Sequence, residues 1–184
     1  MLSPEQGKEL LNLARLAISA SLGRISDIRI SMSNREFLEE NKGAFVTLNK
    51  GSNLRGCVGF TDAELPLGVG VLRAAKGAAF EDTRFKPVTL EELEKIKIEV
   101  TVLTPMKAIK IQSQRDLDKI TIGKDGLRVK YKSAEGLLLP QVAEEYGWTP
   151  EMFLEQTCLK AGLSKNAWLE GASVYKFQGQ VFSE

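Results

Sequence analysis

The segment Leu54-Arg55-Gly56-Cys57-Val58-Gly59-Phe60 decides the expected fold of this chain and carries its most unusual chemistry. It follows an apolar segment, residues 44–48, across a five-residue polar loop, and this spacing predicts two strands joined as an antiparallel hairpin. Gly56 and Gly59 lack a Cβ atom, so each allows another group to approach the backbone or allows the strand to bulge. Arg55 carries a planar fork of five N–H donors that suits a carboxylate or a phosphate.

The composition excludes several classes of function. The 25 Lys and Arg residues nearly balance the 24 Asp and Glu residues, so no strong field favours nucleic acid. Histidine is absent, which excludes Ser–His and Cys–His nucleophile pairs and every histidine metal site. Any catalysis would use a Cys, carboxylate, Lys or Tyr side chain, or a borrowed cofactor. We therefore expect no metal site, and we assign no cofactor.

The N-terminus and the hydropathy pattern indicate where the protein resides. Residues 1–6 lack a basic-then-apolar signal pattern, and no apolar run reaches membrane-spanning length. The two cysteines are far apart and form neither a disulfide framework nor a metal-type pair. We expect a soluble, cytoplasmic protein with no membrane association.

The predicted elements favour a mixed fold. Ser3 and Gln6 form a capping box that predicts a helix from Pro4 to about Leu22. The later predicted elements are a helix over 65–80, a short helix from Thr89, a strand over 95–104, a hairpin over 120–129 that turns at Asp125-Gly126, helices over 141–146 and 149–162, and a strand over 173–182. Because helices and strands do not alternate, we predict an α+β fold with a mostly antiparallel sheet and flanking helices. We expect a single domain over residues 1–184, either one compact unit or two lobes that share one core, the smaller lobe being 109–132 or 23–41.

Cys57 is the candidate nucleophile, with two interpretations that stay open. Free cysteine is among the most buried residue types, so Cys57 could be a small core residue. On a regular strand, however, Arg55 would share its face, and a neighbouring guanidinium favours a thiolate. Cys158 differs, because it lies on the apolar face of a predicted helix and is expected to be buried.

A second polar cluster, Glu81, Asp82 and Arg84, follows the predicted helix over 65–80. Surface ion pairing is its ordinary explanation. If Arg55 is buried, it also needs a carboxylate, which Asp82 or Glu81 would supply. We therefore take Arg55, Gly56, Gly59, Glu81, Asp82 and Arg84 as candidate binding residues.

Several blocks of the sequence resemble the AMMECR family, named after the human Alport syndrome, midface hypoplasia and elliptocytosis candidate region. The segment Leu54-Arg55-Gly56-Cys57-Val58-Gly59 resembles its six-residue signature. Other similar blocks are 43–48, 79–88, 122–127, 136–143, 157–163 and 180–182, so the resemblance covers residues 4–182 in the manner of the short prokaryotic form. Val58 stands where isoleucine is common, and Phe60 where threonine is frequent.

The resemblance implies a fold more than an activity. It implies an α+β domain with an antiparallel sheet and a small subdomain. It also implies a link to Memo-type and radical-SAM proteins, beside which the domain is often found, and a suggested role with RNA or in regulation.

Three functions follow from the residues and the resemblance together. The first is a binding or accessory module whose strand over 54–60 lines a cleft for a protein partner or a small metabolite. The second is a thiol enzyme, with Cys57 as nucleophile, Arg55 holding the thiolate or an anionic substrate, and Asp82 or Glu81 in support. The third, an RNA-associated or regulatory protein, is disfavoured by the near-zero net charge. The sequence leaves the oligomeric state open.

Overall fold

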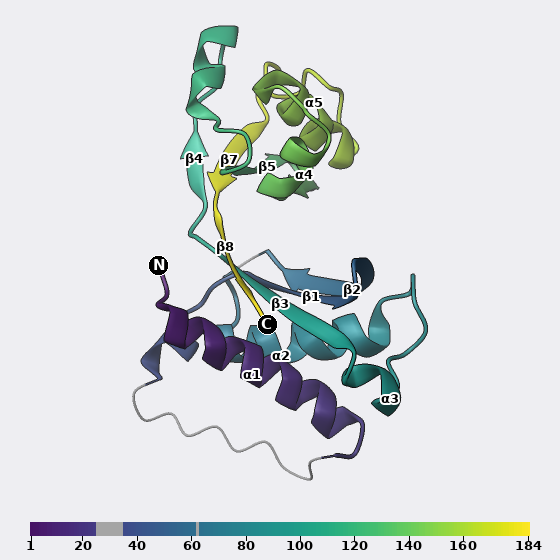
Figure 1. The fold of residues 1–184 in the computed structure, drawn as a ribbon. Coiled ribbons are helices and arrows are strands. Elements are labelled where there is room, and N and C mark those ends of the chain that lie inside the picture. Colours follow the sequence, from purple (N-terminus) through teal and green to yellow (C-terminus); the bar gives the residue numbers. More distant parts are fainter. Residues whose placement is uncertain (25–34, 62) are drawn as a thin grey trace. The chain divides into compact units, whose positions relative to one another are not determined.

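The hairpin predicted from the central segment is present in this computed structural model, which describes residues 1–24, 35–61 and 63–184. Strand β1 (Ala44–Lys50) pairs antiparallel with β2 (Asn53–Phe60). The same hairpin forms one side of a four-stranded sheet whose strand order is β2-β1-β3-β8, so β2 is an edge strand. Figure 1 shows β2 on the outer side of β1.

The chain divides into two units, which are described separately. Unit 1 comprises Met1–Leu103 and Gln180–Glu184, and unit 2 comprises Thr104–Gly179. The alternative smaller lobe over 109–132 lies within unit 2, whereas residues 25–34 of the other alternative lie outside the described residues. The single domain over 1–184 stays a prediction. Among the described residues, no helix has both the length and the apolar character needed to cross a membrane.

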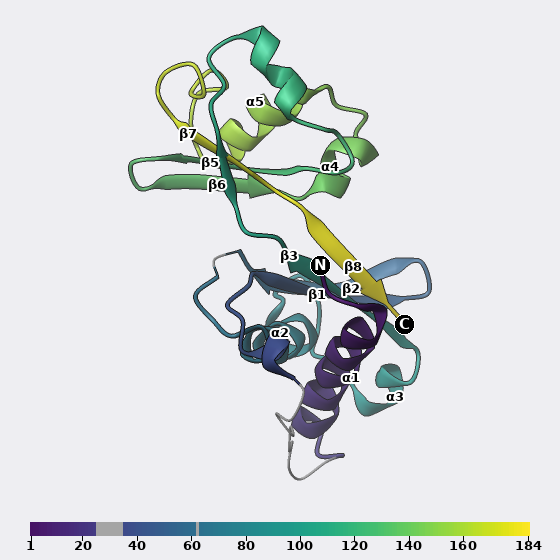
Figure 2. The ribbon, with the colours of Figure 1, turned by 90° about the vertical axis from the view of Figure 1, so that its left-hand side faces the viewer.

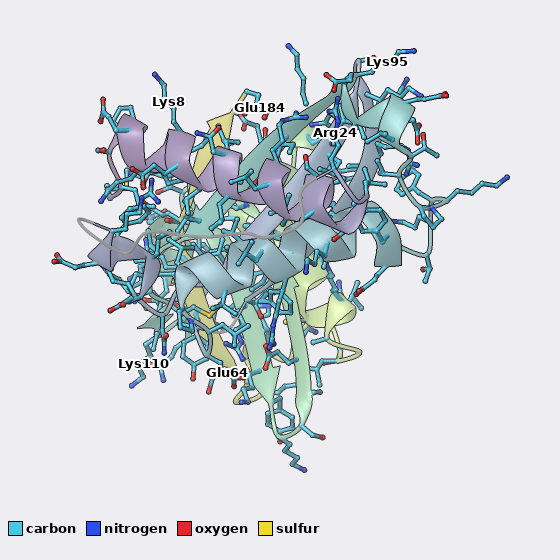
Figure 3. The ribbon with its side chains drawn as sticks, turned by 90° about the horizontal axis from the view of Figure 1, so that it is seen from below. Lys8, Arg24, Glu64, Lys95, Lys110 and Glu184 are labelled. Atoms are coloured by element: carbon cyan, nitrogen blue, oxygen red, sulfur yellow. The ribbon has the colours of Figure 1, made fainter. Side chains whose placement is uncertain are left out.

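In unit 1, helices α1 and α2 pack against one face of the sheet. Figure 3 views them from below, side by side, with Lys8 near the start of α1 and Arg24 beyond its end. The core between helices and sheet includes Leu10, Val46 and Val71, which are fully buried. The elements are α1 (Pro4–Ser21), a 3-10 turn (Glu36–Leu38), α2 (Leu67–Lys76), a π-helical turn η2 (Gly77–Glu81), α3 (Leu90–Leu93), β3 (Ile96–Leu103) and β8 (Gly179–Ser183).

Local sequence signals explain where these helices begin. The predicted capping box of α1 is present, since Gln6 N–H donates to Ser3 Oγ and Ser3 N–H donates to Gln6 Oε1. Thr89 and Glu92 form the same motif at α3. The helix predicted over 65–80 ends as the π-helical turn η2 rather than as α-helix. Turns of this kind are rare and often occur at functional sites.

Unit 2 has its own sheet, in the strand order β4-β7-β5-β6, and its own core around Phe153 and Leu127. Helices α4 and α5 pack against the β5–β6 hairpin, which Figure 2 shows extended. The elements are β4 (Lys107–Ile109), a 3-10 helix (Gln114–Lys119), β5 (Gly126–Tyr131), β6 (Ala134–Leu138), α4 (Pro140–Glu145), α5 (Pro150–Lys160) and β7 (Ser173–Phe177).

The prediction of a hairpin that turns at Asp125-Gly126 is wrong. Asp125 is buried, and its carboxylate accepts hydrogen bonds from Thr121 N–H, Lys176 Nζ and Gln178 Nε2. These contacts draw the pair into the core, and β5 begins only at Gly126. The actual hairpin joins β5 to β6 and turns at Lys132, whose φ of 55° is left-handed.

The single strand predicted over 173–182 is divided in two. β7 belongs to the sheet of unit 2 and β8 to the sheet β2-β1-β3-β8, and Gln178 lies between them. The carbonyl of Gln178 accepts a hydrogen bond from Thr104 N–H, and the N–H of Gln178 donates one to Thr104 Oγ1. Period-two alternation predicts a strand but carries no signal for a change of sheet. The predicted fold class, α+β with antiparallel pairing, is confirmed.

Two glycine substitutions test how tightly η2 packs on β2. A Cβ atom at Gly56 would lie 2.1 Å from the carbonyl oxygen of Ala78, whereas one at Gly70 in α2 would meet nothing within 4 Å. We expect Gly56→Ala to lower the free energy of unfolding by about 1–3 kcal/mol through overpacking. The control, Gly70→Ala, should raise it by about 0.5–1 kcal/mol because alanine is the better helix former. Urea unfolding followed by circular dichroism measures both, and equal effects would contradict this packing.

Candidate functional site

The main chain of Cys57 is held by two side chains from the segment after η2. Cys57 N–H donates to Asp82 Oδ2 over 2.9 Å, and Cys57 C=O accepts from Arg84 Nη2 over 3.4 Å. Arg84 also forms a two-pronged bond to Asp82, from Nε to Oδ1 (2.9 Å) and from Nη2 to Oδ2 (2.7 Å). We call Asp82 and Arg84 the edge bracket, because together they occupy the outer edge of β2 at Cys57.

Arg55 is held by a different carboxylate from the one expected. Its Nη2 and Nε donate to Glu92 at 3.0 and 3.3 Å, and its Nη2 also donates to the carbonyl of Lys86 at 2.8 Å. Lys50 Nζ shares Glu92 Oε1 at 2.9 Å. The prediction that Asp82 or Glu81 pairs with Arg55 is therefore wrong. A bulge explains this, because the β1–β2 register shifts between Leu48 and Asn49 and leaves Arg55 without an opposite residue, which re-aims its side chain.

Phe85 links the two arginines. The guanidinium carbon of Arg55 lies 5.9 Å from the centre of the Phe85 ring, and that of Arg84 lies 5.4 Å from it. Both distances fit a cation–π contact. Arg55 Nη1 is buried and has no hydrogen-bond partner among the described residues. The site therefore holds its cations through carboxylates and one aromatic ring, with a donor of Arg55 uncommitted.

The two carboxylates of the site are held ionised. The hydrogen bond from Arg84 is the main cause that keeps the pKa of Asp82 well below its usual range, with the N–H groups of Cys57 and Arg84 contributing. The hydrogen bonds from Arg55 and then Lys50 lower the pKa of Glu92 to about 2. A carboxylate that is this weakly basic is a poor general base near neutral pH.

The Cys57 sulfur is hydrogen-bonded within the β1–β2 hairpin. Its Sγ accepts a hydrogen bond of 3.4 Å from Thr47 Oγ1, the residue opposite it on β1. The side chain is half-buried, so the thiol is within reach of solvent. No hydrogen bond joins Sγ to Arg55, or to any carboxylate, in the part of the chain that the structure describes. The predicted pairing of the guanidinium with the thiol is absent, because the bulge at Arg55 breaks the alternation that it required.

Gly56 and Gly59 serve packing as well as access. Gly56 lies against the main chain of Ala78 in η2, and a Cβ atom at Gly59 would lie 2.3 Å from the ring of Phe45 on β1. Both positions thus require glycine without any ligand. Gly59 also borders a hollow of about 250 Å³, lined by Gly59, Phe60, Thr61, Glu64 and Leu65.

A larger hollow of about 570 Å³ lies in unit 2, along β4, β7 and the segment 168–172. None of the predicted site residues lines it. Within residues 1–24, 35–61 and 63–184, no cluster of three or more Cys, Asp or Glu side chains is placed to hold a metal ion.

The structure brings four of the predicted residues into one site, namely Arg55, Cys57, Asp82 and Arg84. Glu81 does not join them, since it is the exposed last residue of η2. Sequence reasoning missed Glu92, Phe85, Thr47 and Lys50. The capping box Thr89-x-x-Glu92 was the available signal for Glu92, but a capping motif alone does not tell which cation its carboxylate also meets.

Known proteins match this chain along most of its length. The sequence profile of the AMMECR1 family matches residues 11–182. A protein of Thermofilum pendens is 44% identical and covers 100% of this chain and 92% of its own length. A protein of Methanothermobacter thermautotrophicus is 43% identical, with 100% and 96% covered. The crystal structure of the uncharacterised protein PH0010 from Pyrococcus horikoshii matches at a TM-score of 0.88 and 42% identity, with 100% and 93% covered.

The two thiols should react at very different rates. Cys57 is half-buried, whereas Cys158 is fully buried and burial raises the pKa of its thiol. We expect iodoacetamide to modify Cys57 in the native protein at neutral pH at least tenfold faster than Cys158. Cys158 should react readily only when the protein is unfolded. Peptide mass mapping identifies the site, and Cys57→Ser is the control. Modification of Cys158 first would contradict the structure.

The ionised carboxylates should make stability fall in acid. A lowered folded-state pKa contributes stability above the ordinary carboxyl pKa, and this contribution is lost as pH falls through the folded value. For Glu92 the loss should run from about pH 4.5 down to about pH 2, and for Asp82 it should extend lower. We therefore expect Glu92→Gln to flatten the fall in unfolding free energy between these pH values. Urea unfolding at pH 7, 4 and 3 measures this effect.

The matched control for this experiment is Glu91→Gln. Glu91 is the exposed neighbour of Glu92 and makes no ion pair within the described residues. The control should keep the wild-type dependence on pH. An unchanged slope in Glu92→Gln would show that the ion pair of Arg55 and Glu92 does not contribute to stability.

Proposed function

Because the chain belongs to the AMMECR1 family, we propose a function for its signature strand: it is a binding module that recognises a protein partner through β2 and the edge bracket of Asp82 and Arg84. The main support for this proposal is that Asp82 and Glu92, the carboxylates beside β2, are both in ion pairs with arginines, while the side chain of Arg84 is 56% exposed. The site is therefore rich in fixed hydrogen-bonding groups and poor in proton-transfer groups.

Recognition is favoured by the rigidity of the site. Arg84 is oriented by two bonds to Asp82 and by the ring of Phe85, so its free edge faces solvent at little further entropic cost. Arginine and aromatic side chains are also the residue types that contribute most to binding energy at protein interfaces. The resemblance makes Memo-type and radical-SAM proteins the first partners to test.

A thiol enzyme that uses Cys57 as nucleophile is the second candidate, favoured by the half-buried thiol. It lacks a base, since Asp82 and Glu92 have lowered pKa values and the sequence contains no histidine. Glu99 lies opposite Thr47 on the other side of β1, but its Oε2 accepts from Ser183 Oγ at 3.1 Å, and Thr47 stands between Glu99 and Cys57. Among the described residues, the sulfur has no base in contact.

An RNA-associated role has less support. The formal net charge is +1, and each of Lys50, Arg55 and Arg84 around β2 is in an ion pair, the first two with Glu92 and the third with Asp82. A surface that binds RNA without a strong cationic field would need exposed aromatic rings for stacking. Phe85, beside β2, is half-buried, and its ring already lies near the guanidinium groups of Arg55 and Arg84.

Co-purification distinguishes the binding module from the thiol enzyme. The tagged chain is incubated with an extract of Methanothermobacter thermautotrophicus, and bound proteins are quantified by mass spectrometry. We expect Cys57→Ser to keep the bound proteins within about twofold and Arg84→Gln to reduce them at least tenfold, which is about 1.4 kcal/mol of binding energy.

The matched control is Arg24→Gln. Arg24 is also an exposed arginine of unit 1 in an ion pair, with Glu94, but it lies beyond the end of α1. The melting temperature of each variant shows that its fold is intact. If Cys57→Ser loses the bound proteins and Arg84→Gln keeps them, the thiol, not the bracket, is the functional group.

A further inference from the structure

The main chain of β2 alternates between facing β1 and facing outward. In an antiparallel pair, opposite residues alternate between those that exchange both main-chain hydrogen bonds and those that do not. The N–H and C=O groups of Cys57 are bound by Asp82 and Arg84, so they point away from β1. Gly59 lies two residues further along the same regular register, opposite Phe45, so its N–H and C=O groups point the same way.

The edge bracket imitates a neighbouring strand at one residue only. Asp82 supplies an acceptor to Cys57 N–H, and Arg84 supplies a donor to Cys57 C=O, as a paired strand would. Proteins protect exposed edges in this manner, because unpaired edge groups invite pairing with another chain. No side chain of the described residues hydrogen-bonds the main chain of Gly59, and the hollow of about 250 Å³ lies beside it.

We propose that the outer edge of β2 at Gly59 docks the C-terminal tail of a partner protein, which adds as a short antiparallel strand and ends with its carboxylate at Arg84. This inference rests on the proposed function, because it names the part of the partner that the site takes. An extended chain is the occupant that presents a donor and an acceptor to Gly59 together.

The bracket explains why the occupant is a chain end. A strand that pairs with Gly59 and runs toward Cys57 reaches Asp82 and Arg84 within about two residues, at roughly 3.4 Å for each residue. Since the bracket already fills the place of the next paired residue, the added chain stops there. The end of the tail that lies at the bracket is the carboxyl end, because its negative charge suits the exposed guanidinium of Arg84.

The charges of the site select that end. The side chain of Asp82 is 6% exposed and that of Arg84 is 56% exposed, so the bracket presents its cation to solvent. Glu64, which lines the hollow beside Gly59, is an exposed carboxylate, and it disfavours acidic side chains upstream in the tail. The expected ligand is therefore a tail with a free carboxylate and neutral or basic residues before it.

The premise is tested first by amide hydrogen exchange of the full chain, followed by NMR. We expect the amide of Gly59 to exchange at least tenfold faster than that of Cys57, which donates to Asp82. Equal protection of the two amides would overturn the proposal, because it would mean that the edge at Gly59 is already paired.

The ligand is tested with an immobilised library of random hexapeptides that carry free C-terminal carboxylates. The tightest binders are then compared with their C-terminal amides by titration. We expect the free acids to bind at least tenfold more tightly, and to slow exchange of the Gly59 amide. Arg84→Gln should remove most of this difference, whereas Lys86→Gln should keep it, because Lys86 is a neighbouring exposed cation that meets β2 only through its main-chain carbonyl.

Several results would overturn the proposal. They are a library that yields no binder, acids and amides that bind alike, or binding that leaves the Gly59 amide unprotected. If the site binds internal segments of a chain, the free acids and the amides will bind alike. If the chain instead associates with a second copy through β2, ultracentrifugation will show a dimer. If the peptide experiment fails but Arg84→Gln still loses the co-purified proteins, the tail proposal is wrong and the binding module is supported. If Arg84→Gln keeps those proteins, the binding module itself is rejected.

Discussion

The carboxylate of Asp82 is the interaction on which the rest of the site depends. Its side chain is 6% exposed, and a carboxylate withdrawn from water in this way needs hydrogen bonds to compensate for its lost hydration. Here it accepts from the Cys57 N–H, from the Arg84 N–H and from two nitrogens of the Arg84 guanidinium. Charge-assisted bonds of this kind are short and strong, so the carboxylate fixes both the edge of β2 and the orientation of Arg84.

The position of Asp82 depends in turn on small residues elsewhere. η2 ends at Glu81, and its main chain approaches β2 closely because Gly56 has no side chain, while Gly77 leaves room for Val58. A residue with a Cβ atom at Gly56 would push η2 outward and move Asp82 away from Cys57. The glycines of the signature segment therefore act through packing, and the polar groups act through the positions that this packing gives them.

Sequence reasoning predicted what is encoded locally. The capping boxes predict α1 and α3, and the apolar segments on either side of a short polar loop predict the hairpin over 44–60. Each of these signals depends on residues a few positions apart, and together they indicate the α+β class. Three of the errors involve contacts between residues far apart in the sequence. The Asp125-Gly126 turn, the divided final strand and the partner of Arg55 were each decided by a side chain distant in sequence, Lys176, Thr104 or Glu92. The family resemblance located the site, but neither the bulge at Arg55 nor the bracket has a signal in the sequence pattern.

The same geometry bears on both chemical interpretations of the signature segment. A general base or a paired cation would activate the thiol, and neither is hydrogen-bonded to Sγ among the described residues: the bulge moves Arg55 toward Glu92, and Asp82 is bound to the main chain of Cys57. What the site offers to another molecule is a fixed cation and an outward-facing main chain on an edge strand. Both are groups that recognise a polypeptide, since one suits a carboxylate and the other suits an extended backbone. Cys57 is the strand residue whose main chain the bracket binds, while its sulfur accepts a hydrogen bond from Thr47 Oγ1.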